Sequence, residues 1–272
     1  GNTNGTTATV TVVDNIDPVA VAQDITVALD ANGAASITTA DIDNGSSDNC
    51  SFTLALDVTS FDCDDLGANT VTLTATDGSG NTNGTTATVT VVDNIDPVAV
   101  AQDITVALDA NGAASITTAD IDNGSSDNCS FTLALDVTSF DCDDLGANTV
   151  TLTATDGSGN TNGTTATVTV VDNIDPTISA PLPVTVNVDA GTCSTILSNV
   201  TLGTPVVQDN CVITVTNDAP SGFPLGNTTV TWTVTDGSGN TATATQVVTV
   251  VDNLDPVLSC PSNMVVYGAA DS

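Results

Sequence analysis

The feature that most constrains this chain is an internal repeat of nearly 80 residues. The stretch VVDNIDP, or VVDNLDP in its last copy, stands at residues 12–18, 91–97, 170–176 and 250–256. Successive copies begin 79, 79 and 80 residues apart, and residues 1–97 are identical to residues 80–176. A repeat of this length is typical of tandem modules that each fold as one unit.

The repeat predicts five parts. The first is the C-terminal end of a preceding module (1–18), and the last is the start of a further module (257–272). Between them we expect three full modules: the identical copies 19–97 and 98–176, and the divergent module 177–256. We therefore interpret the chain as a segment of a longer array. No membrane span is visible in it, so we expect no membrane insertion within this segment.

The charge of the chain excludes several classes of partner. All 33 acidic residues are Asp, and Lys, Arg, His and Glu are absent, which gives a net charge of −33. Without cationic side chains the protein cannot neutralise phosphates, which excludes nucleic-acid binding and contact with an anionic membrane. The hydrophobic fraction of 40% argues against disorder. A module of this size buries only a modest core and would benefit from additional cross-links.

The local pattern of the modules is that of β-strands. Apolar and polar residues alternate strictly in 148–156 and 164–172, with the turn signal GSGNTNG between them, which predicts a hairpin. Further strand candidates are 104–108, 113–117 and 131–137. Six or seven short strands per module, with no helical period, predict an all-β fold of tandem immunoglobulin-like antiparallel β-sandwich modules, arranged as an extended rod.

The hairpin also predicts where acidic groups meet. Asp156 and Asn160 flank its turn and should lie at the N-terminal pole of their module, where the preceding linker 93–97 arrives. The strand that ends near Thr118 runs toward the same pole and delivers the loop 120–128. Many oxygen ligands, without His or thiolate, favour a hard cation such as Ca²⁺. The alternative is that DNxDP only ends a strand and begins a turn.

The candidate metal ligands fall into two groups. The primary group is shared by all junctions and consists of Asp14, Asn15, Asp17, Asp77, Asn81, Asp93, Asn94, Asp96, Asp156, Asn160, Asp172, Asn173, Asp175, Asp236, Asn240, Asp252, Asn253 and Asp255. The secondary group lies in the loop 120–128 and its copy, and consists of Asp41, Asp43, Asp48, Asp120, Asp122 and Asp127. The segment DIDNGSSD lacks the closing Glu and the flanking helices of an EF-hand, so that motif is excluded.

The chain resembles a known family. Residues 222–256 (GFPLGNTTVTWTVTDGSGNTATATQVVTVVDNLDP) and 255–263 (DPVLSCPSN) are similar to the hyalin-repeat (HYR) module, as are AGTCS at 190–194 and DNC at 209–211. The identical modules share DNC, LGANTVTLTATDGSGN and the DNIDP end. The resemblance implies an immunoglobulin-like sandwich in extracellular proteins, with an adhesive or structural role. It also implies a setting such as the giant cell-surface adhesins of bacteria, including gliding Bacteroidetes.

The cysteines agree with an extracellular, oxidising setting, in which small domains are commonly stapled by disulfides. Each full module contains two cysteines, which predicts the pairs Cys50–Cys63, Cys129–Cys142 and Cys193–Cys211. Cys260 is left over. In the HYR pattern its partner lies near the last strand, so we expect it to pair within the next module. The alternative is a set of free thiols in a cytosolic protein.

Two function classes remain after the enzymes are excluded, since no His, Lys, Arg or Glu can assist a carboxylate in catalysis. The first is a stiff extender of a cell-surface adhesin or filament, whose partners are the neighbouring modules and other copies in a filament. The second is a set of repeats that themselves bind a surface, a glycan or sister chains. Aromatic residues make up only 3% of the chain, and their scarcity favours the extender.

Overall fold

A computed structural model describes residues 1–256 of the chain. The expected start of a further module, 257–272, and Cys260 lie outside the described residues. The described residues contain no helix that is long and apolar enough to cross a membrane.

The two identical modules share one order of elements, and the third module differs from it. The first contains β1 (Ile25–Ala28), β2 (Ala35–Ser36), α1 (Thr39–Ile42), β3 (Phe52–Leu56), β4 (Ser60–Phe61), a 3-10 helix (Cys63–Asp65), β5 (Gly67–Asp77) and β6 (Thr82–Val92). The second contains β7 (Ile104–Ala107), β8 (Ala113–Ser115), α2 (Thr118–Ile121), β9 (Phe131–Leu135), β10 (Ser139–Asp141), a 3-10 helix (Cys142–Asp144), β11 (Gly146–Asp156) and β12 (Thr161–Val171). The third contains β13 (Thr177–Ser179), β14 (Val184–Asn187), β15 (Ser194–Ile196), a 3-10 helix (Leu197–Asn199), β16 (Val206–Gln208), β17 (Ile213–Asn217), β18 (Gly222–Pro224), β19 (Gly226–Asp236) and β20 (Thr241–Val251).

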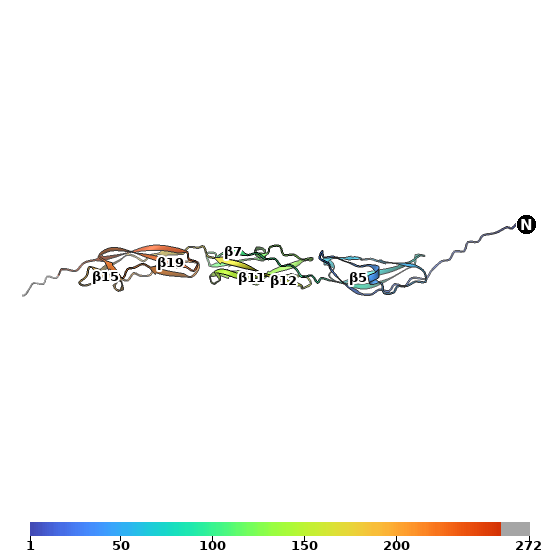
Figure 1. Cartoon of the computed structure of the whole chain (residues 1–272), viewed down its shortest axis with the longest axis horizontal. Helices are drawn as coiled ribbons and strands as arrows, with labels where there is room; N and C mark the ends of the chain where they lie inside the picture. Colours follow the sequence, from blue (N-terminus) through green and yellow to red (C-terminus); the bar gives the residue numbers. More distant parts are fainter. Residues whose placement is uncertain (257–272) are drawn as a thin grey trace, which may run out of the picture. The chain divides into compact units, whose positions relative to one another are not determined.

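A four-stranded sheet forms one layer of each module. In the first module its order is β1-β6-β5-β3, and β2 and β4 pair as a small second sheet. In the second module β11 and β12 are the long neighbouring strands (Figure 1). The predicted all-β sandwich is confirmed, with one difference: β1 pairs with β6 in parallel, Ile25 opposite Val89. Alternation along a strand fixes its buried face but not the direction of its partner.

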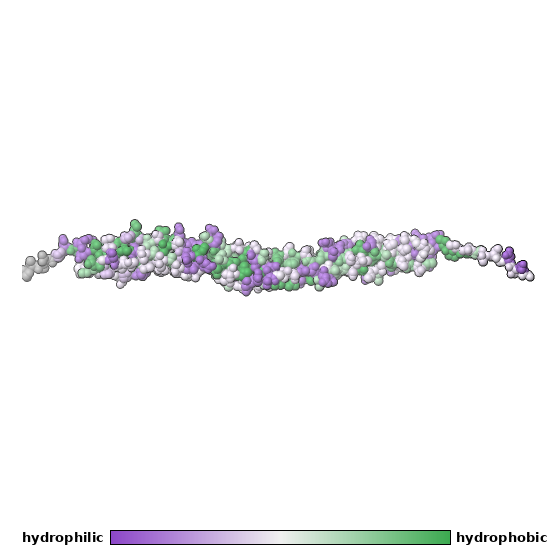
Figure 2. All heavy atoms as spheres, turned by 90° about the horizontal axis from the view of Figure 1, so that it is seen from above, coloured by the Kyte–Doolittle hydropathy of each residue, from purple (hydrophilic) through white to green (hydrophobic). Residues whose placement is uncertain are grey.

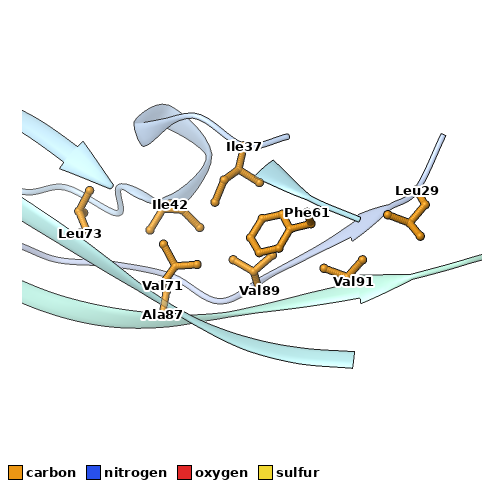
Figure 3. Close-up of a cluster of buried hydrophobic side chains, with 9 residues drawn as sticks. All are labelled: Leu29, Ile37, Ile42, Phe61, Val71, Leu73, Ala87, Val89 and Val91. Carbon is orange, nitrogen blue, oxygen red and sulfur yellow. The ribbon is translucent and has the colours of Figure 1, made fainter. Parts of the chain in front are cut away.

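Alternation places one face of each long hairpin in the core. Val71, Leu73 and Val89 are fully buried, and their side chains face Ile42 and Phe61 from the opposite layer (Figure 3). Ile42 comes from the short helix α1, which the sequence did not predict because four residues are too few to show a helical period. Its first turn is closed by the Thr38 backbone N–H, which donates to Asp41 Oδ2 at 2.7 Å.

The chain divides into two compact units, and the division passes through the second module. The first unit contains residues 1–105, 115–139 and 147–169. The second contains residues 106–114, 140–146 and the described chain from Val170 onward. Each unit therefore holds a complete module together with the end of the second module that adjoins it, so each junction between modules lies inside one unit.

Candidate functional site

Each long hairpin ends in a turn that is closed by its own Asp and Asn. Asp156 ends β11, and its Oδ1 accepts hydrogen bonds from the backbone N–H groups of Asn160 at 2.8 Å and Ser158 at 3.0 Å. The Asn160 side-chain N–H donates to Asp156 Oδ2 at 2.8 Å. Burial raises the pKa of the Asp156 carboxyl, but these hydrogen bonds outweigh burial and hold the pKa below its ordinary value. The turn therefore presents an ionised carboxylate.

The linker that leaves β6 meets this turn. Asp93 follows β6 and is only 4% exposed, and its Oδ1 accepts a hydrogen bond from the Ile95 backbone N–H at 3.0 Å. The Asn160 side-chain N–H donates to the Asp93 backbone C=O at 3.0 Å. The predicted meeting of a hairpin tip with the preceding linker is thus confirmed. The other two junctions repeat the contact through Asn81 to Asp14 at 3.0 Å and Asn240 to Asp172 at 3.1 Å.

The loop before β9 brings a third segment to the same place. Its sequence Asp-Asn-Cys, at 127–129, is shared with the other two modules. The Asn128 side-chain N–H donates to Asp93 Oδ1 at 3.2 Å and to the Asp30 backbone C=O at 3.3 Å. Asp127 Oδ2 accepts a hydrogen bond from the Cys129 backbone N–H at 3.2 Å. The loop is therefore fixed against both the linker and the preceding module.

Three carboxylates gather where these segments meet. One oxygen each of Asp93, Asp127 and Asp156 lies within 4.8 Å of the other two. Two further clusters also consist of three Asp side chains within 4.8 Å of one another. One contains Asp14, Asp48 and Asp77, and the other contains Asp172, Asp209 and Asp236. We call these the junction clusters. An oxygen-only set suits a hard divalent cation such as Ca²⁺ or Mg²⁺.

The junction clusters contain some of the candidates expected from sequence and one residue that was missed. Six members belong to the primary group: Asp14, Asp77, Asp93, Asp156, Asp172 and Asp236. Two belong to the secondary group, namely Asp48 and Asp127. Asp209 was not predicted, although the tripeptide Asp-Asn-Cys at 209–211, shared with the other modules, was the available signal. A metal-binding role for all of these residues stays a prediction.

The remaining candidates have other surroundings. The rest of the linker candidates are exposed to solvent: Asn15, Asp17, Asn94, Asp96, Asn173, Asp175, Asp252, Asn253 and Asp255. The remaining secondary candidates accept hydrogen bonds within their own loops: Asp41 and Asp120 from Thr38 and Thr117, and Asp43 and Asp122 from Ser46 and Ser125. Among the described residues, none of these carboxylates belongs to a junction cluster.

The disulfides join modules to each other, so the predicted pairing within modules is wrong. Cys63 pairs with Cys129, and Cys142 pairs with Cys211, each with 5.7 Å between the two Cα atoms. Cys50 and Cys193 are free and exposed. The predicted pairs Cys50–Cys63, Cys129–Cys142 and Cys193–Cys211 are therefore all replaced.

The reason lies in the position of each cysteine along its module. Cys129 follows the Asp-Asn sequence beside the preceding linker and belongs to the first compact unit. Cys142 begins the 3-10 helix after β10 and belongs to the second unit. Two cysteines of one module thus lie in different units, while cysteines from adjoining modules meet. Counting cysteines per module could not reveal this, because their separation in space depends on the complete fold.

Solved structures of tandem domains match this chain only weakly. A three-domain immunoglobulin fragment of titin matches with 11% identity and a TM-score of 0.40 and covers 87% of this chain and 99% of its own. A fragment of mouse cadherin-23 matches with 14% identity and a TM-score of 0.33 and covers 86% of this chain and 96% of its own. At such TM-scores the likeness carries no argument about function.

The sequence relatives are more informative. Hyalin from Strongylocentrotus purpuratus is 32% identical over 215 residues, and hyalin from Lytechinus variegatus is 37% identical over 131 residues. The matches cover 74% and 44% of this chain but only 18% and 24% of the two hyalins. Neither comparison supports the expected bacterial adhesin. Residues 171–250 match the model of the HYR domain.

Proposed function

We propose that this chain is a structural repeat segment of an extracellular adhesion protein, in which it acts as a stiff extender at the cell surface. The observation that carries the proposal is the covalent connection between successive modules through Cys63–Cys129 and Cys142–Cys211. Persistent disulfides belong to oxidising, extracellular compartments. The same extender would serve a bacterial adhesin, including one used in gliding, as well as an animal extracellular protein.

Stiffness follows from the number of ties at each junction. The linker Asp93–Pro97 alone would allow bending and rotation. The Cys63–Cys129 disulfide adds a second covalent path beside it, and the Asn160 side chain holds the linker backbone by a hydrogen bond. Two covalent paths between the same pair of modules remove most of the rotation that one path permits. This restraint suits an extender, because a stiff segment holds an adhesive region at its far end away from the surface to which the other end is attached.

Calcium at the junctions is the cofactor that we propose for this extender. The junction clusters collect three carboxylates each, and the chain has no Lys, Arg or His to neutralise them. A bound cation would add a further tie between the same segments of adjoining modules.

We propose no catalytic role. The clustered carboxylates lack a neighbouring cationic or imidazole group, which a general acid–base pair would ordinarily use for tuning, since none exists in the chain. Duplication of an entire module without a single change suits a part that sets length.

A second candidate is binding or self-association by the repeats. Its support is a set of exposed hydrophobic residues in the third module: Leu182, Ile196, Val206, Val212 and Leu225 are each more than half exposed. On the face drawn in Figure 2, however, hydrophobic residues form small groups between polar ones. Binding surfaces more often show one larger continuous apolar patch. Sedimentation at increasing concentration tests this candidate, which requires association that Val212→Ser weakens.

The test of the extender is small-angle scattering of the full chain with the disulfides as the only variable. In both proteins Cys50, Cys193 and Cys260 are replaced by serine, so that only the two cross-module disulfides can form. The second protein also has Cys63, Cys129, Cys142 and Cys211 replaced by serine. With excess chelator present, we expect a single narrow distance distribution for the first protein and a broader one for the second. Equal breadth for both would overturn stiffening by the disulfides.

A further inference from the structure

Two of the junction clusters bury negative charge that the chain cannot neutralise. Asp93 and Asp156 are 4% and 7% exposed, and Asp172 and Asp236 are buried to the same degree. Their third members, Asp127 and Asp209, are half-buried. Burial removes the water that would otherwise stabilise these carboxylates, and proximity within 4.8 Å adds mutual repulsion. With no cationic side chain in the sequence, the neutralising charge has to come from solution.

The hydrogen bonds show which oxygens would hold that charge. Asp93 Oδ1 accepts from Ile95 and Asn128, but its Oδ2 is buried without any hydrogen-bond partner. Asp127 uses Oδ2 to accept from the Cys129 backbone N–H, while its buried Oδ1 has no partner. Each of these carboxylates thus engages donors with one oxygen and leaves the other unsatisfied. An unsatisfied buried acceptor is costly and uncommon in a folded protein.

A neighbouring amide adds a further unsatisfied oxygen. The Asn128 side chain donates through its N–H group, and its Oδ1 is buried without a partner. The second full junction repeats the whole pattern in a module of different sequence, with partnerless oxygens on Asp172, Asp209 and Asn210. The third module differs in most of its sequence but keeps the residues that form this pattern, and their repetition points to a common ligand at both junctions.

We propose that each of these two junctions binds one Ca²⁺ ion between its modules. The ligands at the first are Asp93 from the linker, Asp127 and Asn128 from the loop before β9, and Asp156 from the hairpin. At the second they are Asp172, Asp209, Asn210 and Asp236. Ca²⁺ suits the set because it accepts six to eight oxygen ligands in flexible geometry, and water can complete the shell. The smaller Mg²⁺ demands an almost ideal octahedron and gives up its water reluctantly.

The cluster around Asp14 is not included in the proposal. There both Asp14 oxygens already accept hydrogen bonds, from the Ile16 backbone at 3.0 Å and the Asn49 side chain at 3.0 Å. Only Asp48 Oδ1 is left without a partner in that cluster. We expect weaker binding at this cluster than at the other two.

The inference deepens the proposed extender function and rests on it for its purpose, because a cation between modules is useful where modules must not bend. Binding itself can be measured independently of stiffness. The site variant is Asp127→Asn with Asp209→Asn, which removes one ligand charge at each junction and keeps an oxygen for the backbone N–H groups of Cys129 and Cys211. The matched control is Asp96→Asn with Asp175→Asn, which removes the same charge from exposed linker residues.

Calorimetric titration of the intact, disulfide-bonded chain with CaCl₂ in about 0.15 M NaCl tests the site. We expect two strong sites besides the weaker binding at the cluster around Asp14, an affinity of the strong sites reduced at least about tenfold in the site variant, and little change in the control. Equal losses in both variants would mean diffuse attraction to an Asp-rich surface and would overturn the proposal. Tighter binding of MgCl₂ than of CaCl₂ would overturn the assignment to Ca²⁺.

Thermal melting of the same proteins adds a second, independent signature. With excess chelator the site variant should melt at a higher temperature than the parent, because one of three mutually repelling carboxylates has become neutral. With Ca²⁺ the order should reverse, because only the parent gains fully from the ion. A parent that melts identically with and without Ca²⁺ would refute the site. If its scattering curve nevertheless remains that of a stiff particle, the extender function survives that result.

Discussion

Two glycines leave room for the loop of the following module. Gly112 has a φ of +73°, and a Cβ added to it would lie 2.6 Å from the Asn210 backbone oxygen and 2.7 Å from Cys142 Sγ. Gly33 has the same surroundings at the first junction, with Asn128 and Cys63. A side chain at either position would therefore collide with rigid backbone and with a disulfide. These glycines set how close adjoining modules can come.

We expect Gly112→Ala to destabilise the second junction by about 1–3 kcal/mol beyond the cost of its backbone conformation. Gly124→Ala is the matched control, because Gly124 has a φ of +94° but open space around its Cβ. Chemical denaturation of both variants measures the difference. Asp-N digestion and mass spectrometry should also find less Cys142–Cys211 in Gly112→Ala. Equal costs for the two variants would show that only the backbone conformation matters.

Another residue-scale effect concerns pH. The Thr151 backbone N–H donates to Asp136 Oδ1 at 2.8 Å, and this bond, followed by one from the Thr151 side chain, lowers the pKa of the Asp136 carboxyl. A carboxyl with a lowered folded pKa stabilises the fold above its unfolded value of about 3.9, and this contribution disappears as the pH falls through the folded pKa.

Asp136→Asn should accordingly melt below the parent at pH 6, and the gap should close as the pH falls toward 2. Asp57→Asn, in the identical first module, should behave in the same way, because the Thr72 backbone N–H donates to Asp57 at 2.7 Å and lowers its pKa. Melting temperatures at several pH values in the presence of chelator provide the measurement. A gap that stays constant with pH would contradict the electrostatic origin.

At the scale of the elements, the sequence predicts the long hairpins and their ends well. Strict alternation fixes the buried face of β11 and β12, and the Asp-Gly-Ser-Gly-Asn turn fixes where Asp156 lies. From these two facts the meeting of the turn with the preceding linker could be predicted. The direction of β1 and the short helix α1 could not, because both depend on tertiary packing that leaves no local period.

Some acidic residues of the site could be predicted from the local sequence, and others depend on tertiary packing. Asp93 follows β6 directly and Asp156 is the last residue of β11, so their position follows from strand length. Asp127 and Asp209 lie in loops, and which loop oxygen reaches the cluster depends on the contacts of Asn128 and Asn210 with the linker. The pairing of cysteines is a property of the junction and could not be derived from one module. Loop and junction geometry is thus the part that sequence reasoning left open.

The third module contains a buried polar network that the identical modules lack. Gln246 is 1% exposed, accepts a hydrogen bond from Trp232 Nε1–H at 3.1 Å, and donates to the backbone C=O groups of Leu182 at 2.8 Å and Leu202 at 2.7 Å. Ala87 is its buried counterpart in β6, opposite Val71 as Gln246 is opposite Val230. The side chain thus ties the sheet to two loops.

Gln246→Met should destabilise the third module by about 1–3 kcal/mol, because it keeps the volume but removes the partner of the buried Trp232 Nε1–H and of two partly buried backbone C=O groups. Trp232 is the only Trp of the chain, so its fluorescence reports unfolding of this module alone. Denaturation followed by Trp fluorescence checks the shift. Val212→Met at an exposed position is the control and should leave the midpoint unchanged. An unshifted midpoint in Gln246→Met would show that water satisfies these groups.

On the scale of the whole molecule, the net charge of −33 sets the problem that the junctions have to solve. Like charges favour extended, separated modules and discourage lateral association, but they also weaken each contact between modules. The strength of a disulfide does not depend on this repulsion. A bound cation, by contrast, attracts the clustered carboxylates of both modules and so stabilises the contact between them. The disulfide holds the modules by a covalent bond and the cation holds them by electrostatic attraction, and both act on the same loop. Asp127, Asn128 and Cys129 are consecutive residues, and Cys129 forms the disulfide.

Because both ties hold the same loop, we expect each to compensate for loss of the other. Scattering of the full chain in four states, with Ca²⁺ or chelator and with the disulfides intact or replaced by serine, measures this. Loss of one tie should broaden the distance distribution little, and loss of both should broaden it strongly. The disulfide, which closes a loop of 66 residues, should also tighten Ca²⁺ binding, because it holds Asp127 near Asp93 before the ion arrives. The two ties would instead act on independent parts of the junction if the broadening from losing both equals the sum of the two single losses, and if the Ca²⁺ affinity is the same with and without the disulfide.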